Sequence, residues 1–405
     1  MRYIFVSSEH LRMKYSFLLC GLLLFGTIFG FGQTAPRTFV LNGAALAKNK
    51  LTIKANDPAL TLLLKRADKI LNAGKFYSVM DKTQLPPSGN KHDYMSQAPY
   101  WWPDPYKPNG LPYVKRDGER NPELNKISDT AEMDDMIDDA QTTALAYFFT
   151  GHETYAKHSA DLIRTWFLDT KTAQNPNLKF SQEIPGINKG RGIGLIETRE
   201  LYQVIDAAIL LQTSKAWTRT DHLGLKNWFA DFSKWMLESD LGKEEAKAKN
   251  NHGTHYDVQV IAYSIFCDHP ETALKEIETA KRRIVSQLEK DGSQPLELER
   301  TLSWGYTNMN LLGFLTIAQL ASNLNVDLWN YESDGRSIKR AVEWLAPYAA
   351  GKKKWTYQQI KPITYEKTQQ IFRLASKKDS NPKYLELADS LPTDAFLTAI
   401  DKLTN

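Results

Sequence analysis

The feature that most constrains the fold of this chain is a series of apolar stripes with the helical period of 3.6 residues. Strand-like alternation is scarce, and the helical stretches are of moderate length and follow one another in pairs. No repeat of fixed period is visible, which disfavours solenoid families. The pattern predicts helices over about 57–72, 129–149, 153–167, 198–211, 221–237, 254–266, 270–288, 307–320, 337–345 and 384–403. We therefore expect one all-α domain over residues 35–405, most simply a barrel of helix hairpins.

Two irregular regions, 81–125 and 170–194, interrupt this series. Both are rich in Pro, Gly and Asn and are longer than connecting loops normally are, which is typical of functional or disordered segments. The first contains the run from Tyr100 to Pro105, Tyr-Trp-Trp-Pro-Asp-Pro, which is too aromatic for a solvated linker. We expect this segment to pack across the helical body.

The N-terminus has the layout of a secretory signal. An apolar run over 16–31 follows Arg12 and Lys14 and precedes small and polar residues. The run is shorter than the roughly 20 residues that span a bilayer, although an uncleaved anchor is the alternative. We predict a signal peptide over 1–34, a periplasmic or secreted protein, and no stable membrane anchor after cleavage.

The net charge and the cysteine content limit which ligands the protein can bind and how it can be stabilised. The formal net charge is +4 over 405 residues, too weak for a nucleic-acid footprint, though a local basic cleft for a polyanion needs only a few residues. Without the signal, Cys267 is the one cysteine left and cannot form an internal disulfide. We expect a monomer that is stabilised by packing and binds no nucleic acid.

The first candidate site is the run from Asn250 to Asp257, Asn-Asn-His-Gly-Thr-His-Tyr-Asp. Thr254 and Asp257 have the spacing of a capping box before an apolar helical face. Asn251 and His252 then precede a helix N-terminus, which offers an anion backbone N–H donors and the positive end of the helix dipole. The alternative is that the asparagines form turns and the histidine is an ordinary polar residue.

Histidines at 252 and 255 also suggest a metal site, since two imidazoles three residues apart can share a helix face. However, no HExxH pattern is present, and Gly253 leaves the local geometry open. We predict neither a metal nor a cofactor.

Two further helix entrances carry polar residues. Glu299 to Tyr306 precedes one apolar helix, and Gly190 to Arg199 precedes another without the strand that a dinucleotide-binding fingerprint requires. In a barrel of alternating helices the entrances of the inner helices lie on one rim. We therefore expect all three entrances to surround one cleft.

This set of side chains suits β-elimination on a uronic acid polymer. The C5 proton becomes removable only when the neighbouring carboxylate is neutralised, as Asn251 could do, and the developing enolate-like charge is then stabilised. His252 can act as the base because imidazole titrates near neutral pH, and Tyr306 can protonate the leaving oxygen. Arg300 would favour the phenolate of Tyr306, which could serve as both base and acid when both steps occur on one face of the sugar.

At these residues the chain resembles the alginate lyase superfamily of polysaccharide lyases. The likeness rests on Asn250-Asn251-His252, on Arg300 and Tyr306, and on the aromatic run that begins at Tyr100. The resemblance implies an incomplete (α/α) toroid that cleaves mannuronate or guluronate polymers by β-elimination. It gives Asn251 as neutraliser, His252 as base and Tyr306 as acid, with Arg300 supporting the tyrosine or the substrate carboxylate. The less basic segment between Arg300 and Tyr306 fits glucuronan as well as alginate.

Aromatic faces stack on sugars, and arginine presents a bidentate fork to carboxylates. Aromatic residues beside prolines can instead fix a loop, and charges on loops can be merely solvated. The predicted substrate-binding residues are Tyr100, Trp101, Trp102, Lys189, Arg191, Glu197, Arg199, His255 and Trp304.

Two other function classes stay open at this point. A glycoside hydrolase on the same architecture would need two suitably spaced carboxylates, with Glu197, Glu297 and Glu299 as the nearest candidates. A noncatalytic sugar-binding protein would use the aromatic loop alone.

Overall fold

The computed structural model describes residues 35–405, so the predicted signal peptide lies outside the described residues. Successive helices pack as antiparallel pairs, as the short connections between them favour, and none of the helices in 35–405 has the length and apolarity to cross a bilayer. The helices are α1 (Gly43–Thr52), α2 (Pro58–Ala73), α3 (Asp129–Thr150), α4 (Glu153–Phe167), α5 (Tyr202–Leu210), α6 (Arg219–Glu238), α7 (Asp240–Ala246), α8 (Asn251–Phe266), α9 (Pro270–Gln287), α10 (Pro295–Leu298), α11 (Ser303–Ser322), α12 (Ile338–Ala349), α13 (Glu366–Asp379), α14 (Pro382–Ser390) and α15 (Ala395–Thr404).

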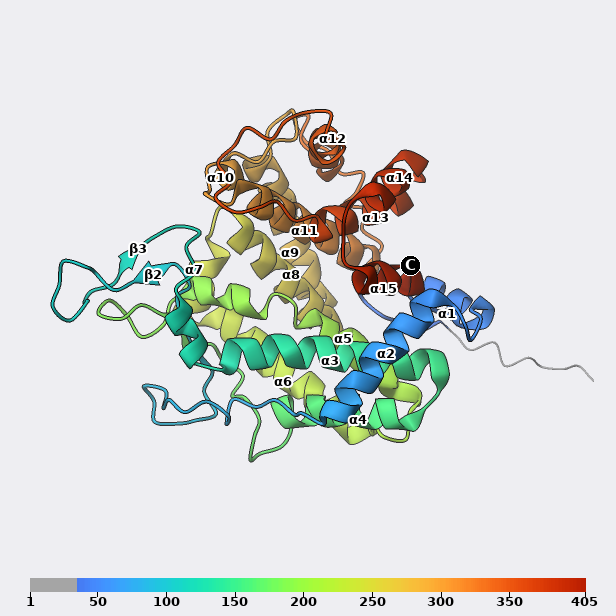
Figure 1. The fold of residues 1–405 in the computed structure, drawn as a ribbon, viewed down its shortest axis with the longest axis horizontal. Helices are drawn as coiled ribbons and strands as arrows, with labels where there is room; N and C mark the ends of the chain where they lie inside the picture. Colours follow the sequence, from blue (N-terminus) through green and yellow to red (C-terminus); the bar gives the residue numbers. More distant parts are fainter. Residues whose placement is uncertain (1–34) are drawn as a thin grey trace, which may run out of the picture. The chain divides into compact units, whose positions relative to one another are not determined.

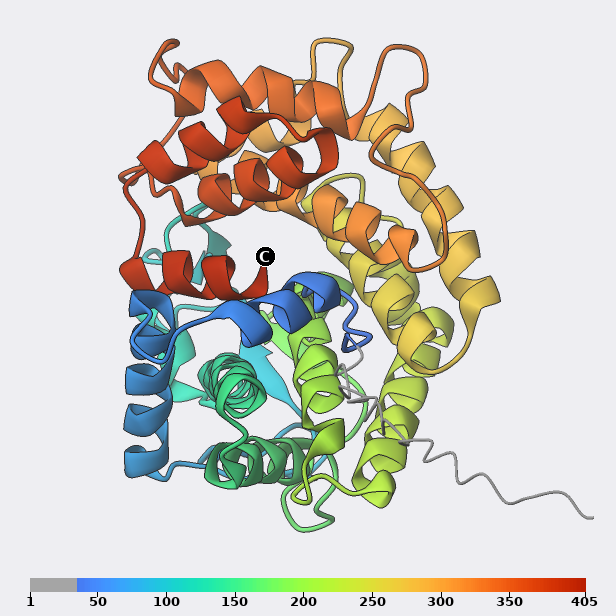
Figure 2. The same cartoon turned by 90° about the vertical axis from the view of Figure 1, so that its right-hand side faces the viewer.

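The helix pairs follow one another around a ring. In Figure 2 the colours run around it from blue through green and yellow to red, and α15 returns to pack on α1 and α2 (Figures 1 and 2). Helices α3, α5, α8, α11 and α13 form the inner layer, each in contact with the next. The expected all-α, incomplete (α/α) toroid is confirmed.

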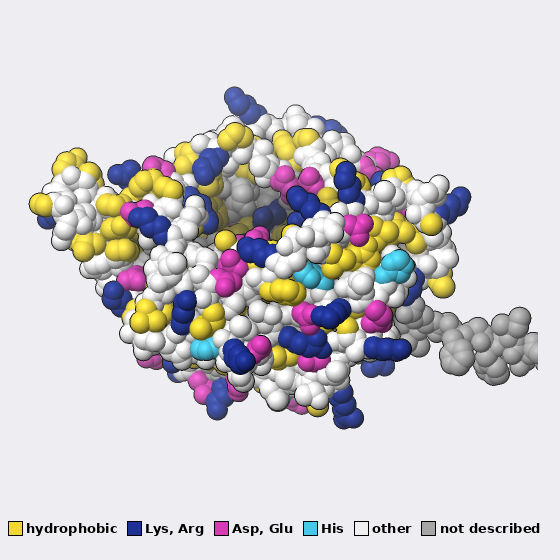
Figure 3. All heavy atoms as spheres, turned by 60° about the horizontal axis from the view of Figure 1, so that its bottom comes forward, with side chains coloured by type: hydrophobic (Ala, Val, Ile, Leu, Met, Phe, Trp, Pro, Cys, Tyr) yellow, Lys and Arg dark blue, Asp and Glu magenta, His cyan; other side chains and the backbone are white. Residues whose placement is uncertain are grey.

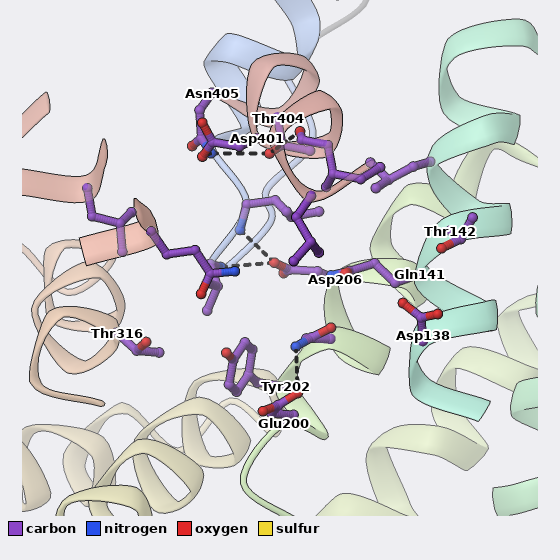
Figure 4. Close-up of a pocket in the computed structure, with 18 of the residues that line it drawn as sticks. Asp138, Gln141, Thr142, Glu200, Tyr202, Asp206, Thr316, Asp401, Thr404 and Asn405 are labelled. Carbon is purple, nitrogen blue, oxygen red and sulfur yellow. Dashed lines mark hydrogen bonds between the residues drawn. The ribbon is translucent and has the colours of Figure 1, made fainter. Parts of the chain in front are cut away.

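Between α13 and α3 the ring is completed by α15 and α2, which pack on each other. Segment 38–41 lies between α5 and α11: Asp206 of α5 accepts hydrogen bonds from the backbone N–H groups of Phe39, Val40 and Leu41, and Gln319 of α11 donates to the carbonyl of Val40. The side chain of Asp206 points toward this segment, with α15 close by (Figure 4). A cavity of about 300 Å³ remains beside it.

Most helix boundaries agree with the predicted ones, and the span of α4 agrees at both ends. The predicted helix 198–211 is shortened to α5, which follows a 3-10 turn, η2 (Gly192–Thr198), and the predicted helix 384–403 is divided into α14 and α15. The expected capping box of Thr254 and Asp257 was wrong, because α8 begins earlier, at Asn251. Thr254 donates to Gln287 of α9, and Asp257 binds Arg283 of the same helix.

The two irregular regions pair with each other. Strand β1 (Met95–Gln97) of the first lies parallel to β4 (Phe180–Glu183) of the second. Beyond β1 the first region extends as a lobe, residues 98–121, in which β2 (Trp101–Trp102) pairs antiparallel with β3 (Val114–Lys115) (Figure 1). The short 3-10 turn η1 (Pro122–Lys126) follows the lobe. The region is thus packed on α3 at its start and projects as the lobe further along.

A buried ion pair anchors the start of this region. The ammonium of Lys82 lies 2.9 Å from Asp129 at the beginning of α3, and both side chains are fully buried. Lys82 also donates to the carbonyls of Val79 and Lys91, while Asp129 accepts from the N–H of Met95. Burial raises the pKa of Asp129 to about 6, against the opposing effect of the ammonium. Because neither charge is solvated, each depends on the other for its stabilisation.

Replacing Lys82 with Met should therefore destabilise the protein strongly. The uncompensated buried carboxylate is expected to cost about 3–5 kcal/mol of unfolding free energy, measured by equilibrium urea unfolding. The control is Lys290→Met, which breaks an exposed ion pair with Asp334 and should barely move the midpoint. Equal midpoints for the two variants would show that the buried pair does not anchor the region.

Candidate active site

Three helix entrances converge on one cleft, as expected. The cleft measures about 490 Å³ and is lined by residues of η2, of the start of α8, of the segment before α11 and of the lobe. In Figure 3 this side of the molecule is hollowed next to the lobe, the protrusion at the left, and Lys and Arg side chains lie around the hollow. The predicted residues that line the cleft are Tyr100, Trp101, Arg191, Glu197, Arg199, Asn251, His252, Arg300 and Tyr306.

Asn251 is held by a buried carboxylate on α10. As the first residue of α8, its backbone N–H has no partner inside the helix, and Glu297 Oε1 accepts it at 2.7 Å. The other oxygen of Glu297 accepts from Asn251 Nδ2, also at 2.7 Å. Both residues are almost completely buried, and burial raises the pKa of Glu297. The carboxylate thus fixes the orientation of the amide and uses one of its two amide hydrogens.

The next residues of α8 place His252 against α7. His252 Nδ1 lies 2.8 Å from Glu245 Oε1, and the ring lines the cleft. Gly253 is required here, because a Cβ atom at this position would lie 2.2 Å from both the carbonyl oxygen of Ala248 and the guanidinium of Arg283. The glycine of the motif therefore serves close packing behind the imidazole.

Tyr306 lies in the first turn of α11, between a guanidinium and a second phenol. The guanidinium carbon of Arg300 is 3.8 Å from the centre of the Tyr306 ring. The Tyr306 hydroxyl donates to the hydroxyl of Tyr100 at 2.8 Å. Burial raises the pKa of Tyr306 above its ordinary value, and this outweighs the lowering effect of Arg300. The phenol is therefore protonated at neutral pH and available as an acid.

Asp117 of the lobe fixes Arg300. Its carboxylate accepts from two nitrogens of the guanidinium, at 2.6 and 3.2 Å, and from the hydroxyl and N–H of Thr301. Burial would raise the pKa of Asp117, but the hydrogen bonds from Arg300 and Thr301 outweigh it and lower the pKa to about 2. Gly118 has φ +76°, and a Cβ there would lie 2.4 Å from the Thr301 hydroxyl. The lobe is thus locked onto the segment that carries Arg300.

Further basic side chains line the cleft from two sides. Arg191 and Arg199 come from η2 and its flanks, while Lys115 and Arg120 come from the lobe. Glu197 accepts from the hydroxyls of Tyr94 and Ser96, and burial raises its pKa to about 7. The excess of basic side chains makes the cleft suitable for an anionic ligand.

Four predicted binding residues do not line this cleft. Trp304 is buried against Trp355, and the indole donates to a backbone carbonyl. Lys189 pairs with Glu183 at the surface, and Trp102 lies under the guanidinium of Arg116 in the lobe. His255 is buried, with Nε2 3.2 Å from the carbonyl of Met309.

The carboxylates behind the cleft were not predicted from the sequence. Neither Glu245 nor Asp117 was predicted as a site residue, and Glu297 was predicted only as a candidate member of a hydrolase pair. Lys115 and Arg120 of the lobe were missed as well. No spacing rule identifies them, because each meets its partner through tertiary packing.

The second cavity, beside Asp206, has an acidic lining (Figure 4). Its lining includes Asp138, Glu200, Asp206 and Asp401, and among the described residues no Lys or Arg lines it. Such a lining repels a polyanion. The cleft at the helix entrances is therefore the candidate active site.

Comparisons with known proteins agree with this architecture. The family model described as alginate lyase matches residues 78–355. The structure of an alginate lyase from Bacteroides ovatus is 41% identical, with a TM-score of 0.86, and the match covers 91% of this chain and 99% of that one. The search of curated proteins found no match.

More distant structures share the fold. Alginate lyase A1-III from Sphingomonas species A1 is 16% identical with a TM-score of 0.58, over 93% of this chain and 99% of that one. A variant of A1-III complexed with a tetrasaccharide is 15% identical with a TM-score of 0.61, over 93% and 98%. The extent of the family match and the 41% identity together decide the assignment: this chain belongs to the alginate lyase family and is a polysaccharide lyase that acts on an anionic polysaccharide.

Proposed function

We propose that the protein cleaves uronic acid polymers, alginate or glucuronan, by a β-elimination that its side chains carry out without a metal. The observation that carries this proposal is the meeting of His252 and Tyr306, from different helices, in one cleft with Asn251 and Arg300. An imidazole, a phenol, an amide and a guanidinium together supply a base, an acid and stabilisation for a developing negative charge.

The first requirement of the reaction is neutralisation of the substrate carboxylate. Glu297 holds the amide of Asn251 and uses one of its two amide hydrogens. The remaining hydrogen can donate to the carboxylate of a uronate in the cleft. Because Asn251 is buried and held in place, little reorganisation is needed when charge develops on that group.

The elimination itself moves one proton off the sugar and one onto it. The C5–H bond breaks toward His252, a double bond forms between C4 and C5, and the C4–O bond breaks. Tyr306, whose hydroxyl is protonated at neutral pH, donates its proton to the leaving oxygen. Where the C5 proton lies on the face of Tyr306, this phenol would have to act as both base and acid.

The alternative of a glycoside hydrolase has less support. Both oxygens of Glu297 are occupied by Asn251, and Glu299 does not line the cleft. One oxygen of Glu197 accepts two hydroxyl hydrogen bonds. Hydrolysis would need two carboxylates free to act on one glycosidic bond.

One assay separates the three function classes. The mature protein is incubated with alginate and with glucuronan, and ultraviolet absorbance is followed together with reducing ends. Elimination is expected to raise both signals, because the new C4–C5 double bond absorbs. Reducing ends without absorbance would indicate a hydrolase, and neither signal would indicate a sugar-binding protein.

Tyr306→Phe and His252→Ala should each lose nearly all activity on the polymer that the wild-type protein cleaves. Loss of an acid or a base is expected to lower kcat by about 100- to 10,000-fold in variants that remain folded, as judged by circular dichroism. Full activity in either variant would remove that residue from the mechanism.

Asp117→Asn tests the support of Arg300. Because a hydrogen bond to a charged group contributes about 1.5–3 kcal/mol, kcat/KM should fall roughly 10- to 100-fold. Glu119→Gln, an exposed change in the same lobe, is the matched control and should behave as wild type. Equal kcat/KM for both variants would argue against a role for the clamp in activity.

We also propose that the protein is exported, on the basis of the signal-like sequence of residues 1–34. Expression of the full chain in a bacterium, followed by fractionation and intact mass measurement, should find a shortened chain outside the cytoplasm. A full-length cytoplasmic or membrane-bound product would contradict export.

A further inference from the structure

Glu245 of α7 is a fully buried carboxylate whose one side-chain hydrogen bond among the described residues is with His252. Its Oε1 lies 2.8 Å from His252 Nδ1, and its Oε2 is buried without a hydrogen-bond partner in residues 35–405. A buried carboxylate normally has several donors, because burial of an unpaired charge is costly. The exposed fraction of the His252 side chain is 17%, so one edge of its ring reaches the cleft.

The backbone around this pair is held rigidly. Arg283 of α9 donates to the carbonyls of Ala246 and Ala248, which lie between the two residues in the chain. Its Nε donates to Asp257 of α8 at 2.7 Å. One guanidinium thus ties the end of α7 to α8 and fixes the distance between Glu245 and His252.

We propose that Glu245 is a positioning residue that sets the tautomer of His252 for proton abstraction; this inference rests on the proposed function. A carboxylate can only accept, so Nδ1 must carry a hydrogen toward it. In the neutral ring the lone pair is then on Nε2, the nitrogen that Glu245 leaves free for the cleft. This is the nitrogen that can take the C5 proton.

The same contact stabilises the product of that proton transfer. When Nε2 accepts the C5 proton, the ring becomes an imidazolium, and its Nδ1–H then donates to an anion in a poorly solvated site. Charge-assisted hydrogen bonds of this kind are roughly twice as strong as neutral ones. Glu245 therefore favours the transition state over the resting state.

The test uses Glu245→Gln in the mature protein, on a polymer whose cleavage His252→Ala abolishes. A glutamine amide can either donate or accept, so it no longer imposes one tautomer. We expect kcat to fall about 100-fold or more, with KM little changed. Glu245→Asp keeps an acceptor-only group and should recover part of the lost kcat.

The matched control is Glu244→Gln, which removes the same charge from the neighbouring exposed position on α7. Glu244 accepts from the N–H of Gly192, and a glutamine oxygen can still do so. This variant should retain wild-type kcat. Thermal unfolding of all variants shows whether a loss of activity is merely a loss of fold.

The tautomer is observed directly by ¹⁵N NMR of protein labelled at histidine, with the His252 signal assigned from its absence in His252→Ala. The wild-type ring should carry its hydrogen on Nδ1, and Glu245→Gln should show a mixture. A wild-type ring with hydrogen on Nε2 alone, or wild-type kcat in Glu245→Gln, would overturn the proposal. If the wild-type protein forms no unsaturated product, the proposed function fails, whereas the NMR result still decides the tautomer.

Discussion

Carboxylates behind the cleft, two of them buried and one half-buried, hold its polar side chains in place, and the arrangement of the site depends on this interaction. Glu245 accepts from His252, Glu297 from Asn251, and Asp117 from Arg300. Each of these contacts joins two different elements of the chain. Because a buried carboxylate must find donors, the contacts fix both the side chains and the packing of α7, α10 and the lobe around the cleft.

This arrangement also resolves an electrostatic problem. A cleft for a polyanion should present donors and positive charge, yet the donors themselves need acceptors to hold them in place. Here those acceptors lie behind the donors, while basic side chains such as Arg191, Arg199 and Lys115 line the cleft. The acidic lining of the second cavity, beside Asp206, is kept apart from them at another place in the ring.

The sequence predicts the all-α architecture well, because apolar periodicity reports directly which helix faces are buried. It also places Asn251, His252, Arg300 and Tyr306 at helix entrances, which the ring brings together. The prediction was wrong at Thr254, because partners from α9 override the local capping pattern. Tertiary contacts of this kind have no signature in local spacing.

The same reason explains which site residues were missed. Glu245 meets His252 where Arg283 of α9 binds the backbone between them, and Asp117 meets Arg300 from a lobe far away in the sequence. Trp304 stands in the sequence between Arg300 and Tyr306, but its side chain turns into an aromatic cluster with Trp355. Proximity in sequence therefore did not predict proximity to the cleft.

The most direct test of the central claim is a crystal structure of the inactive His252→Ala protein with a uronate oligosaccharide bound. The account predicts one sugar whose carboxylate lies within about 3.5 Å of Asn251 Nδ2, with its C4 oxygen at a similar distance from the Tyr306 hydroxyl. An oligosaccharide bound outside this cleft, or one whose carboxylates all face away from Asn251, would contradict it.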